Sequence, residues 1–112
     1  MDWMLRGFRQ FSAPVSLVLT YDKYLEPAAI THFGLGSLAY GIVLSAWEKG
    51  IGCVINGQGI MQSDVVRKHA NIPDDQNIMI CIALGYPDKD FAANDVRSVR
   101  ADNSEFLTYV GF

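Results

Sequence analysis

The sequence predicts a mixed fold, α+β or α/β, in which a small sheet is arranged around one long helix. Three short runs rich in apolar and β-branched residues indicate strands, and one long segment with two apolar faces indicates a helix. The order along the chain is strand, long helix, strand, short helix, strand. The chain has 112 residues, the usual length of one domain, so we expect residues 1–112 to fold as a single unit.

The first strand and the long helix follow an aromatic and basic lead-in that ends before Pro14. Residues 15–21 place apolar or β-branched side chains on both alternating faces, as in a strand that is covered on two sides. The long helix is expected over residues 27–49. Pro27 is tolerated in a first helical turn, and Gly50 supplies a helix stop.

Apolar side chains occupy two faces of the predicted helix, with a row of small residues between them. The first face carries Leu35, Leu38, Ala39, Ile42 and Ala46. The second carries Phe33, Tyr40, Leu44 and Trp47, and the small row is Gly34, Ser37, Gly41 and Ser45. We therefore expect the helix to be buried between the sheet and a second subunit, as the interface of a homodimer. Residues 30–47 only just reach membrane-spanning length, and His32 and the lack of a flanking basic cluster argue against a membrane helix.

Two further strands and a short helix complete the predicted domain. Residues 51–56 indicate a short buried strand, and residues 78–84 form the most apolar strand of the chain. Between them Ser63 can cap a short helix over residues 64–69. The tail over residues 88–112 has too little helix or strand signal for an assignment, and its terminal aromatic residues need a surface to pack on.

Charge and cysteine content exclude several classes of protein. With 9 Lys and Arg against 12 Asp and Glu, the net charge of −3 offers no electrostatic footprint for a nucleic acid or an anionic membrane. The apolar share of 50% excludes intrinsic disorder and suggests an additional buried surface. Cys53 and Cys81 lie inside apolar runs and are expected to be buried free thiols. The N-terminal residues lack the pattern of a signal peptide, so we expect a cytoplasmic protein.

The sequence contains few groups suited to nucleophilic or metal-dependent catalysis. His32 and His69 are the only histidines, and no spacing typical of a metal site or a nucleophile elbow occurs. The loop Gly57-Gln58-Gly59 follows a strand and precedes a helix. It is either a plain turn or a place where backbone amides converge on an electron-rich ligand. Arg97 and Arg100 form either surface ion pairs or an anion clamp, and composition does not choose between the two.

Several segments, spread over about residues 11–112, carry a family resemblance. They are Ala13-Pro14-Val15 before a strand, Glu48-Lys49-Gly50-Ile51-Gly52-Cys53 after the helix, Asp64-Val65-Val66-Arg67 with Ile72-Pro73, Ala83-Leu84-Gly85-Tyr86-Pro87-Asp88, and Asn94 with Arg97 and Arg100. Together they resemble the C-terminal half of an FMN-dependent nitroreductase-family protein. The most specific pieces are the Leu-Gly-Tyr-Pro strand end and the Asn-x-x-Arg-x-x-Arg tail.

The resemblance implies an α+β, nitroreductase-like fold, with a small sheet packed on a long central helix, truncated and dimeric. It implies FMN bound between the subunits and hydride transfer from NAD(P)H to nitro or quinone-type acceptors. By position, Gln58 and Gly59 would face the isoalloxazine ring, with the Gly59 amide near the reactive nitrogen. Arg97 and Arg100 would lie near the phosphate. No catalytic acid, base or metal ligand is required of the protein.

The chain departs from the family in lacking the N-terminal half, which carries a basic segment that grips phosphate and ribose. Half of the usual flavin pocket is therefore expected to be missing, which would weaken or alter FMN binding and impair catalysis. The alternative is a non-catalytic dimeric binding or scaffold module that retains the fold, and a third reading is one half of a larger enzyme.

Overall fold

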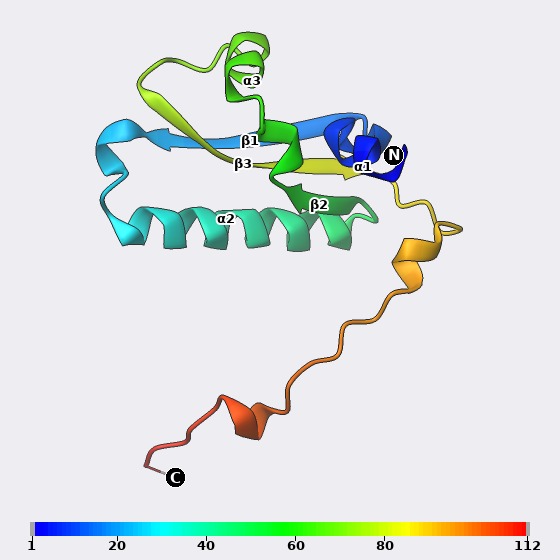
Figure 1. The fold of residues 1–112 in the computed structure, drawn as a ribbon. Coiled ribbons are helices and arrows are strands. Elements are labelled where there is room, and N and C mark those ends of the chain that lie inside the picture. Colours follow the sequence, from blue (N-terminus) through cyan, green and yellow to red (C-terminus); the bar gives the residue numbers. More distant parts are fainter. Residues whose placement is uncertain (1, 112) are drawn as a thin grey trace.

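The computed structural model describes residues 2–111 and contains a three-stranded antiparallel sheet with a long helix on one face (Figure 1). The strands are β1 (Val15–Asp22), β2 (Gly52–Asn56) and β3 (Gln76–Gly85), in the order β1-β3-β2. The central strand β3 pairs Ile82 with Leu17 of β1 and with Ile55 of β2. Ile82 is 0% exposed, so the core lies at the middle of β3. The three predicted strands are confirmed, each within two residues of its predicted ends.

The long helix α2 (Ala29–Glu48) confirms the prediction of a helix over residues 27–49. It begins slightly later and ends slightly earlier than predicted. It runs along one face of the sheet, where Ala39 and Ala46 are buried. Its other side is uncovered: Phe33 is 73% exposed and Trp47 is 66% exposed. The chain by itself therefore covers one of the two predicted apolar faces, and burial of the other by a second subunit stays a prediction.

Within residues 2–111, α2 is also the one helix that is long and apolar enough to cross a membrane, judged by length and composition alone. Its buried alanines show that this helix covers the sheet. The prediction that the protein has no membrane partner stays a prediction.

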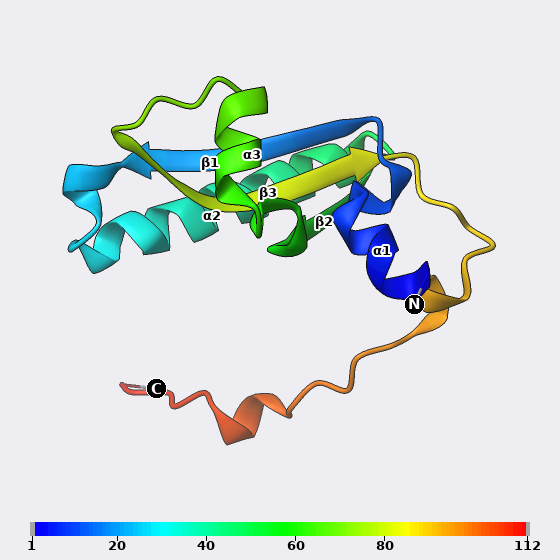
Figure 2. The same ribbon diagram turned by 45° about the horizontal axis from the view of Figure 1, so that its top comes forward.

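Two short helices flank the sheet, as Figure 2 shows. One lies at an end of the sheet, and the other lies on the face opposite α2. Helix α1 (Asp2–Phe8) falls in the lead-in, where the sequence pattern predicts no element. Helix α3 (Ser63–His69) confirms the predicted short helix, but the prediction that Ser63 caps it is wrong, because Ser63 lies inside the helix and Gln62 precedes it. The Arg67 guanidinium donates hydrogen bonds to two backbone carbonyls in the loop after α3 and to the carbonyl of Gln76, the first residue of β3, at 2.9 Å. These bonds join α3 to the start of β3.

A left-handed turn connects α1 to β1. Gln10, Phe11 and Ser12 form the 3₁₀ helix η1 with φ values of 53°, 56° and 59°. Each non-glycine residue in the left-handed region of backbone conformation lowers the stability of the fold by roughly 1–2 kcal/mol. Contacts elsewhere must therefore hold this segment in place, and those made by Gln10 are described below.

The C-terminal tail leaves the body of the molecule after β3 (Figures 1 and 2). Apart from two short 3₁₀ helices, η4 (Ala92–Asp95) and η5 (Asn103–Glu105), it has no regular structure within the described residues. The radius of gyration is 17.0 Å, whereas a compact chain of this length has about 13 Å. Phe106 is 63% exposed, so the surface that the tail aromatics are expected to need is not supplied by this chain.

Candidate functional site

The glycine loop of the sequence forms a tight turn at the end of β2. The strand ends at Asn56, and Gln58–Ile60 form the 3₁₀ helix η3. The Asn56 side-chain oxygen Oδ1 accepts a hydrogen bond from the Gly59 N–H at 2.9 Å. An asparagine side chain that bonds a backbone amide a few residues on is a typical way to fix a turn. The Gly59 amide therefore has a defined partner within the chain.

Residues from α1 and η1 lie directly against this turn. A Cβ atom placed on Gly59 would come within 1.6 Å of Gln10 Nε2 and 2.6 Å of Cys81 Sγ. A Cβ atom on Gly7 would lie 1.5 Å from Gln58 Oε1. A side chain at Gly7 would have to displace the Gln58 side chain, which lies against α1, and one at Gly59 would meet both Gln10 and the buried Cys81.

An uncharged polar cluster of Gln10, Asn56 and Cys81 surrounds the Gly59 amide. The Cys81 thiol donates to the Asn56 backbone oxygen at 3.0 Å, and Asn56 Nδ2 donates to Gln10 Oε1 at 3.3 Å. Gln10 Nε2 lies 3.5 Å from Cys81 Sγ. Cys81 is 1% exposed, which confirms that it is a buried free thiol, whereas the free thiol Cys53 is only half-buried. Sequence reasoning missed Gln10 and Asn56, although an asparagine at a strand end three positions before a glycine is a recognisable turn signal.

A groove of about 330 Å³ opens beside this cluster, between α3 and the sheet. It is lined by Gln10, Ser16, Val18, Gly59, Val65, Val66, His69, Ala70 and Cys81. The lining is mainly apolar. The groove shows that the turn is reached from the α3 side of the sheet, opposite α2.

The structure does not bring Arg97 and Arg100 to the turn. Both lie in the exposed tail, between η4 and η5, where the chain has left the sheet (Figure 1). The tail starts close to α1, because the Arg6 guanidinium lies 5.2 Å from the centre of the Phe91 ring. Within one chain, the four predicted FMN-binding residues therefore form two separate pairs.

A carboxyl group with a lowered pKa lies in the same tail, at η5. Hydrogen bonds from the Ser104 hydroxyl and backbone N–H lower the pKa of Asp102 below its ordinary value of 3.8. The side chains of Asp102 and Glu105 form a capping box at this turn. This carboxylate has a local structural role and is fully exposed. Among residues 2–111, no group of three or more His, Cys, Asp or Glu side chains is placed to hold a metal ion.

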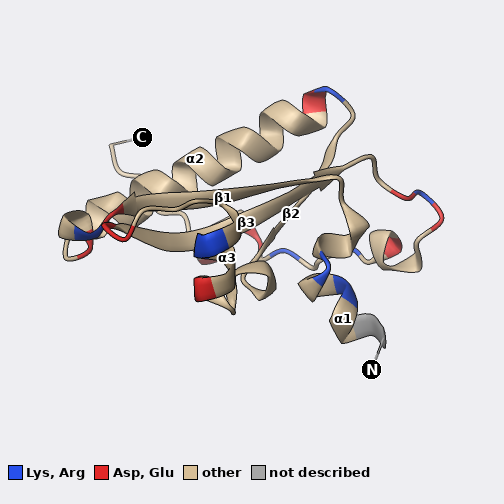
Figure 3. Cartoon of the chain, turned by 90° about the horizontal axis from the view of Figure 1, so that it is seen from above, with Lys and Arg blue, Asp and Glu red and all other residues tan. Residues whose placement is uncertain are grey.

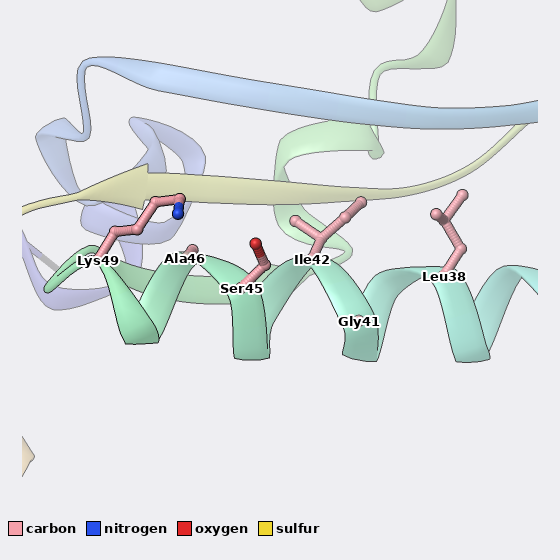
Figure 4. A pocket seen from close by; sticks show the side chains of 6 residues that line it. All are labelled: Leu38, Gly41, Ile42, Ser45, Ala46 and Lys49. Atoms are coloured by element: carbon pink, nitrogen blue, oxygen red, sulfur yellow. The ribbon is translucent and has the colours of Figure 1, made fainter.

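The uncovered side of α2 is the second candidate surface. The helix carries no Lys, Arg, Asp or Glu before Glu48 (Figure 3). A shallow groove of about 420 Å³ runs along the flank of α2 that faces the strands, and it contains Gly41 and Ser45 of the predicted small row. In Figure 4 the side chains of Leu38, Ile42, Ser45 and Lys49 extend from the helix toward the strands. Leu38 is 52% exposed in the single chain, so the sheet does not fully cover this flank of the helix.

This fold and the sequence around the turn define the class of protein. The model of the nitroreductase family matches residues 2–86, which include all three strands, α2 and the turn. The chain belongs to the nitroreductase family.

Individual relatives match almost the whole chain. It is 35% identical to the chloronitrobenzene nitroreductase of Comamonas testosteroni, over 94% of this chain and 45% of that protein. It is 33% identical to the nitrobenzene nitroreductase of Ectopseudomonas oleovorans, over 94% of this chain and 45% of the relative. The chain thus spans about half the length of the curated relatives that it matches.

Solved structures confirm the α+β, nitroreductase-like fold. The crystal structure of the FMN and NADPH-dependent nitroreductase NfnB from Sphigopyxis sp. strain HMH superposes with a TM-score of 0.85 at 23% identity, covering 99% of this chain and 51% of that one. A nitroreductase-like family protein from Bacillus cereus superposes with a TM-score of 0.65 at 20% identity, covering 97% of this chain and 61% of that one. The small sheet and the long helix are therefore parts of a shared fold.

Proposed function

We propose that this chain serves a nitroreductase-type oxidoreductase that uses FMN to transfer hydride from NAD(P)H to nitro or quinone-type acceptors. The observation that carries the proposal is the family match over residues 2–86. Two relatives that match most of the chain are named for the reduction of nitroaromatic compounds. The structural relative NfnB is described as dependent on FMN and NADPH.

The residue types of the two candidate pairs fit FMN. The η3 turn offers uncharged polar groups, the Gln58 carboxamide and the Gly59 backbone amide that Asn56 holds in place, of the kind that suits the polar edge of a flavin ring. Arg97 and Arg100 offer guanidinium groups, which bind phosphate with charge-assisted hydrogen bonds. We propose that Gln58 and Gly59 contact the ring and that the two arginines contact the phosphate.

We further propose that FMN lies between the subunits of a homodimer formed through α2. Phe33, Tyr40 and Trp47 are 63–73% exposed on this helix. Full burial of each large apolar side chain contributes about 1.5–3 kcal/mol, so a second copy would find a strong driving force here. The two pairs of candidate FMN contacts, which one chain keeps apart, could then be combined from different subunits.

The chemistry asked of this chain is limited. FMN, when bound, supplies the hydride transfer itself. The residues of the turn would orient the ring and donate to it, and the apolar groove beside the turn would exclude water from one side. No side chain of this cluster is charged, so the chain holds or moves no proton in the proposal. The two free thiols favour a reducing compartment, and we propose a cytoplasmic location.

A non-catalytic dimeric binding or scaffold module is the second candidate. The observation that favours it is the internal use of the turn: the Gly59 N–H bonds Asn56, and the Gln58 side chain lies against Gly7. In this alternative the contacts of the turn serve the stability of the fold.

Absorption spectra of the purified protein distinguish the two candidates. Recorded before and after addition of FMN, they are expected to show a flavin band that stays with the protein through gel filtration. Oxidation of NADH and NADPH is then measured with nitrobenzene or a quinone as acceptor. A colourless protein that neither retains FMN nor oxidises either nucleotide contradicts the first proposal and supports the second.

A further inference from the structure

We infer that Asn56 is the positioning residue of the candidate flavin site, because its side chain determines where the Gly59 amide lies. The inference rests on the proposed function for its consequence, since Gly59 is one of the proposed ring contacts. Its structural part rests on the hydrogen bonds of the turn alone.

Asn56 is placed to act through both ends of its side-chain amide. Oδ1 accepts from the Gly59 N–H at 2.9 Å, while Nδ2 donates to Gln10 Oε1 at 3.3 Å. The two partners distinguish oxygen from nitrogen, since an N–H needs an acceptor and the Gln10 oxygen needs a donor. The orientation of the Asn56 amide is therefore determined by its surroundings.

The register of the sheet holds Asn56 in this place. Asn56 is the last residue of β2 and pairs with Cys81 of β3. The Cys81 thiol donates to the Asn56 backbone oxygen at 3.0 Å, and Cys81 is 1% exposed. The side chain that bonds Gly59 is thus attached to the most buried part of the core.

The turn has little room to relax if the Asn56 bond is lost. Gly59 lies against Gln10 and Cys81 so closely that even a methyl group would overlap with both. The loss of Oδ1 would leave the Gly59 N–H without its acceptor beside these groups, which is costly for a half-buried donor. The turn would then move, and the amide would leave the position proposed for contact with the ring.

Three variants separate this role from a general structural one. Asn56→Leu keeps the size of the side chain and removes both polar atoms. Asn56→Asp keeps an acceptor oxygen for the Gly59 N–H. Asn77→Leu is the matched control, because Asn77 is also a strand asparagine with one side-chain bond, to Glu26 Oε2 at 3.2 Å, away from the turn.

Hydrogen exchange of the Gly59 amide, followed by NMR on the flavin-free protein, is the first readout. Exchange is expected to become about tenfold faster in Asn56→Leu, as for the loss of one hydrogen bond, and to stay near the original rate in Asn56→Asp and Asn77→Leu. The Ile82 amide reports whether the core remains folded. An unchanged Gly59 rate in a folded Asn56→Leu protein overturns the inference.

A second variant is available if Asn56→Leu does not fold. Gln10→Met removes the group that orients Asn56 and is expected to accelerate exchange at Gly59 by a smaller factor. An unchanged exchange rate at Gly59 in this variant also overturns the inference.

FMN affinity and the visible spectrum of bound FMN are the second readout. Asn56→Leu is expected to weaken FMN binding about tenfold and to shift the flavin band, and Asn56→Asp to restore the affinity to within about threefold of the original. Unchanged or tighter binding by Asn56→Leu overturns the positioning role, and tighter binding would mean that Asn56 competes with the flavin for the amide. If the unaltered protein binds no FMN, the proposed function fails and the functional half of the inference fails with it. The exchange experiment still decides the structural half.

Discussion

The Arg6 guanidinium lies 5.2 Å from the centre of the Phe91 ring, and this contact joins the first helix of the chain to the start of its tail. Cations over aromatic faces at exposed sites contribute about 0.5–1 kcal/mol. Arg6→Gln is therefore expected to free the tail more often and to raise the rate of trypsin cleavage after Lys89 by about two- to fivefold. Arg9→Gln, on the same segment, is the control. Equal cleavage of the two variants would show that the ring contact does not hold the tail.

The small row on α2 predicts how the proposed dimer can be broken. No atom of the chain lies within 4 Å of a Cβ added at Gly41 or at Gly36, so a side chain at either position leaves the single subunit undisturbed. Gly41→Leu fills the groove along the helix and is expected to halve the mass measured by light scattering. Gly36 lies between Phe33 and Tyr40 of the exposed apolar face, so Gly36→Leu is expected to weaken the dimer as well. Lys68→Leu, an exposed position of α3 on the opposite face of the sheet, is the control and should leave the dimer intact. A dimeric Gly41→Leu protein would contradict an interface at this row.

Close packing around the turn predicts a large difference between two neighbouring glycines. Gly59→Ala would place a methyl group onto Gln10 and Cys81, and overpacking of this kind typically costs about 1–3 kcal/mol of unfolding free energy. Gly57 has a φ of −88° and open space around it, so Gly57→Ala is expected to be neutral or slightly stabilising. Urea unfolding measures both. Similar stability of the two variants would show that the contacts around Gly59 yield easily.

The arginines of the tail predict a phosphate-dependent loss of flavin affinity. Arg97→Gln and Arg100→Gln are each expected to weaken FMN binding about tenfold, as for a charge-assisted hydrogen bond, and to leave the affinity for riboflavin unchanged. Lys89→Gln removes a tail charge outside the predicted motif and serves as the control. Equal losses for FMN and riboflavin would assign the two arginines a role away from the phosphate.

The capping box at η5 predicts a local response to acid. The pKa of Asp102 is lowered by the Ser104 hydroxyl and N–H, so the folded turn favours the carboxylate. The stability that these hydrogen bonds contribute is fully present when the pH is above the ordinary pKa of 3.8, and it is lost as the pH falls through the lowered pKa of the folded turn. The amide resonance of Ser104 is expected to shift in this range toward its position in Asp102→Asn. A titration of Ser104 that persists in Asp102→Asn would assign the response to another group.

The elements that the sequence predicts correctly are those with a periodic pattern of apolar residues. The strands and α2 each carry a pattern repeated over many residues, and the structure confirms them. Helix α1 is too short and too mixed in composition to carry such a pattern. The two-sided apolar character of α2 is correctly predicted from spacing, but which side the chain itself covers depends on how the helix is rotated on the sheet.

The candidate site is predicted less completely, because it depends on contacts between distant residues. The loop over residues 57–59 is visible as a glycine pair after a strand. The polar cluster around it requires the β2–β3 register, which places Asn56 opposite Cys81. It also requires the left-handed turn that brings Gln10 to these two residues, which lie 46 and 71 positions away in the sequence. The spacing of neighbouring residues in the sequence predicts neither of these long-range contacts. A subunit contact between the tail and the turn would be equally invisible to it.

The sheet has consequences for handling the protein. Both β1 and β2 pair with β3 on one side only, so a row of backbone amides and carbonyls faces outward along each of them. Water satisfies such a row in dilute solution, but a strand of another molecule can do so as well. The eight residues of β1 form the longer of these two borders, and a charged substitution there should delay fibrillar or amorphous precipitation of concentrated samples more than the same change in β2.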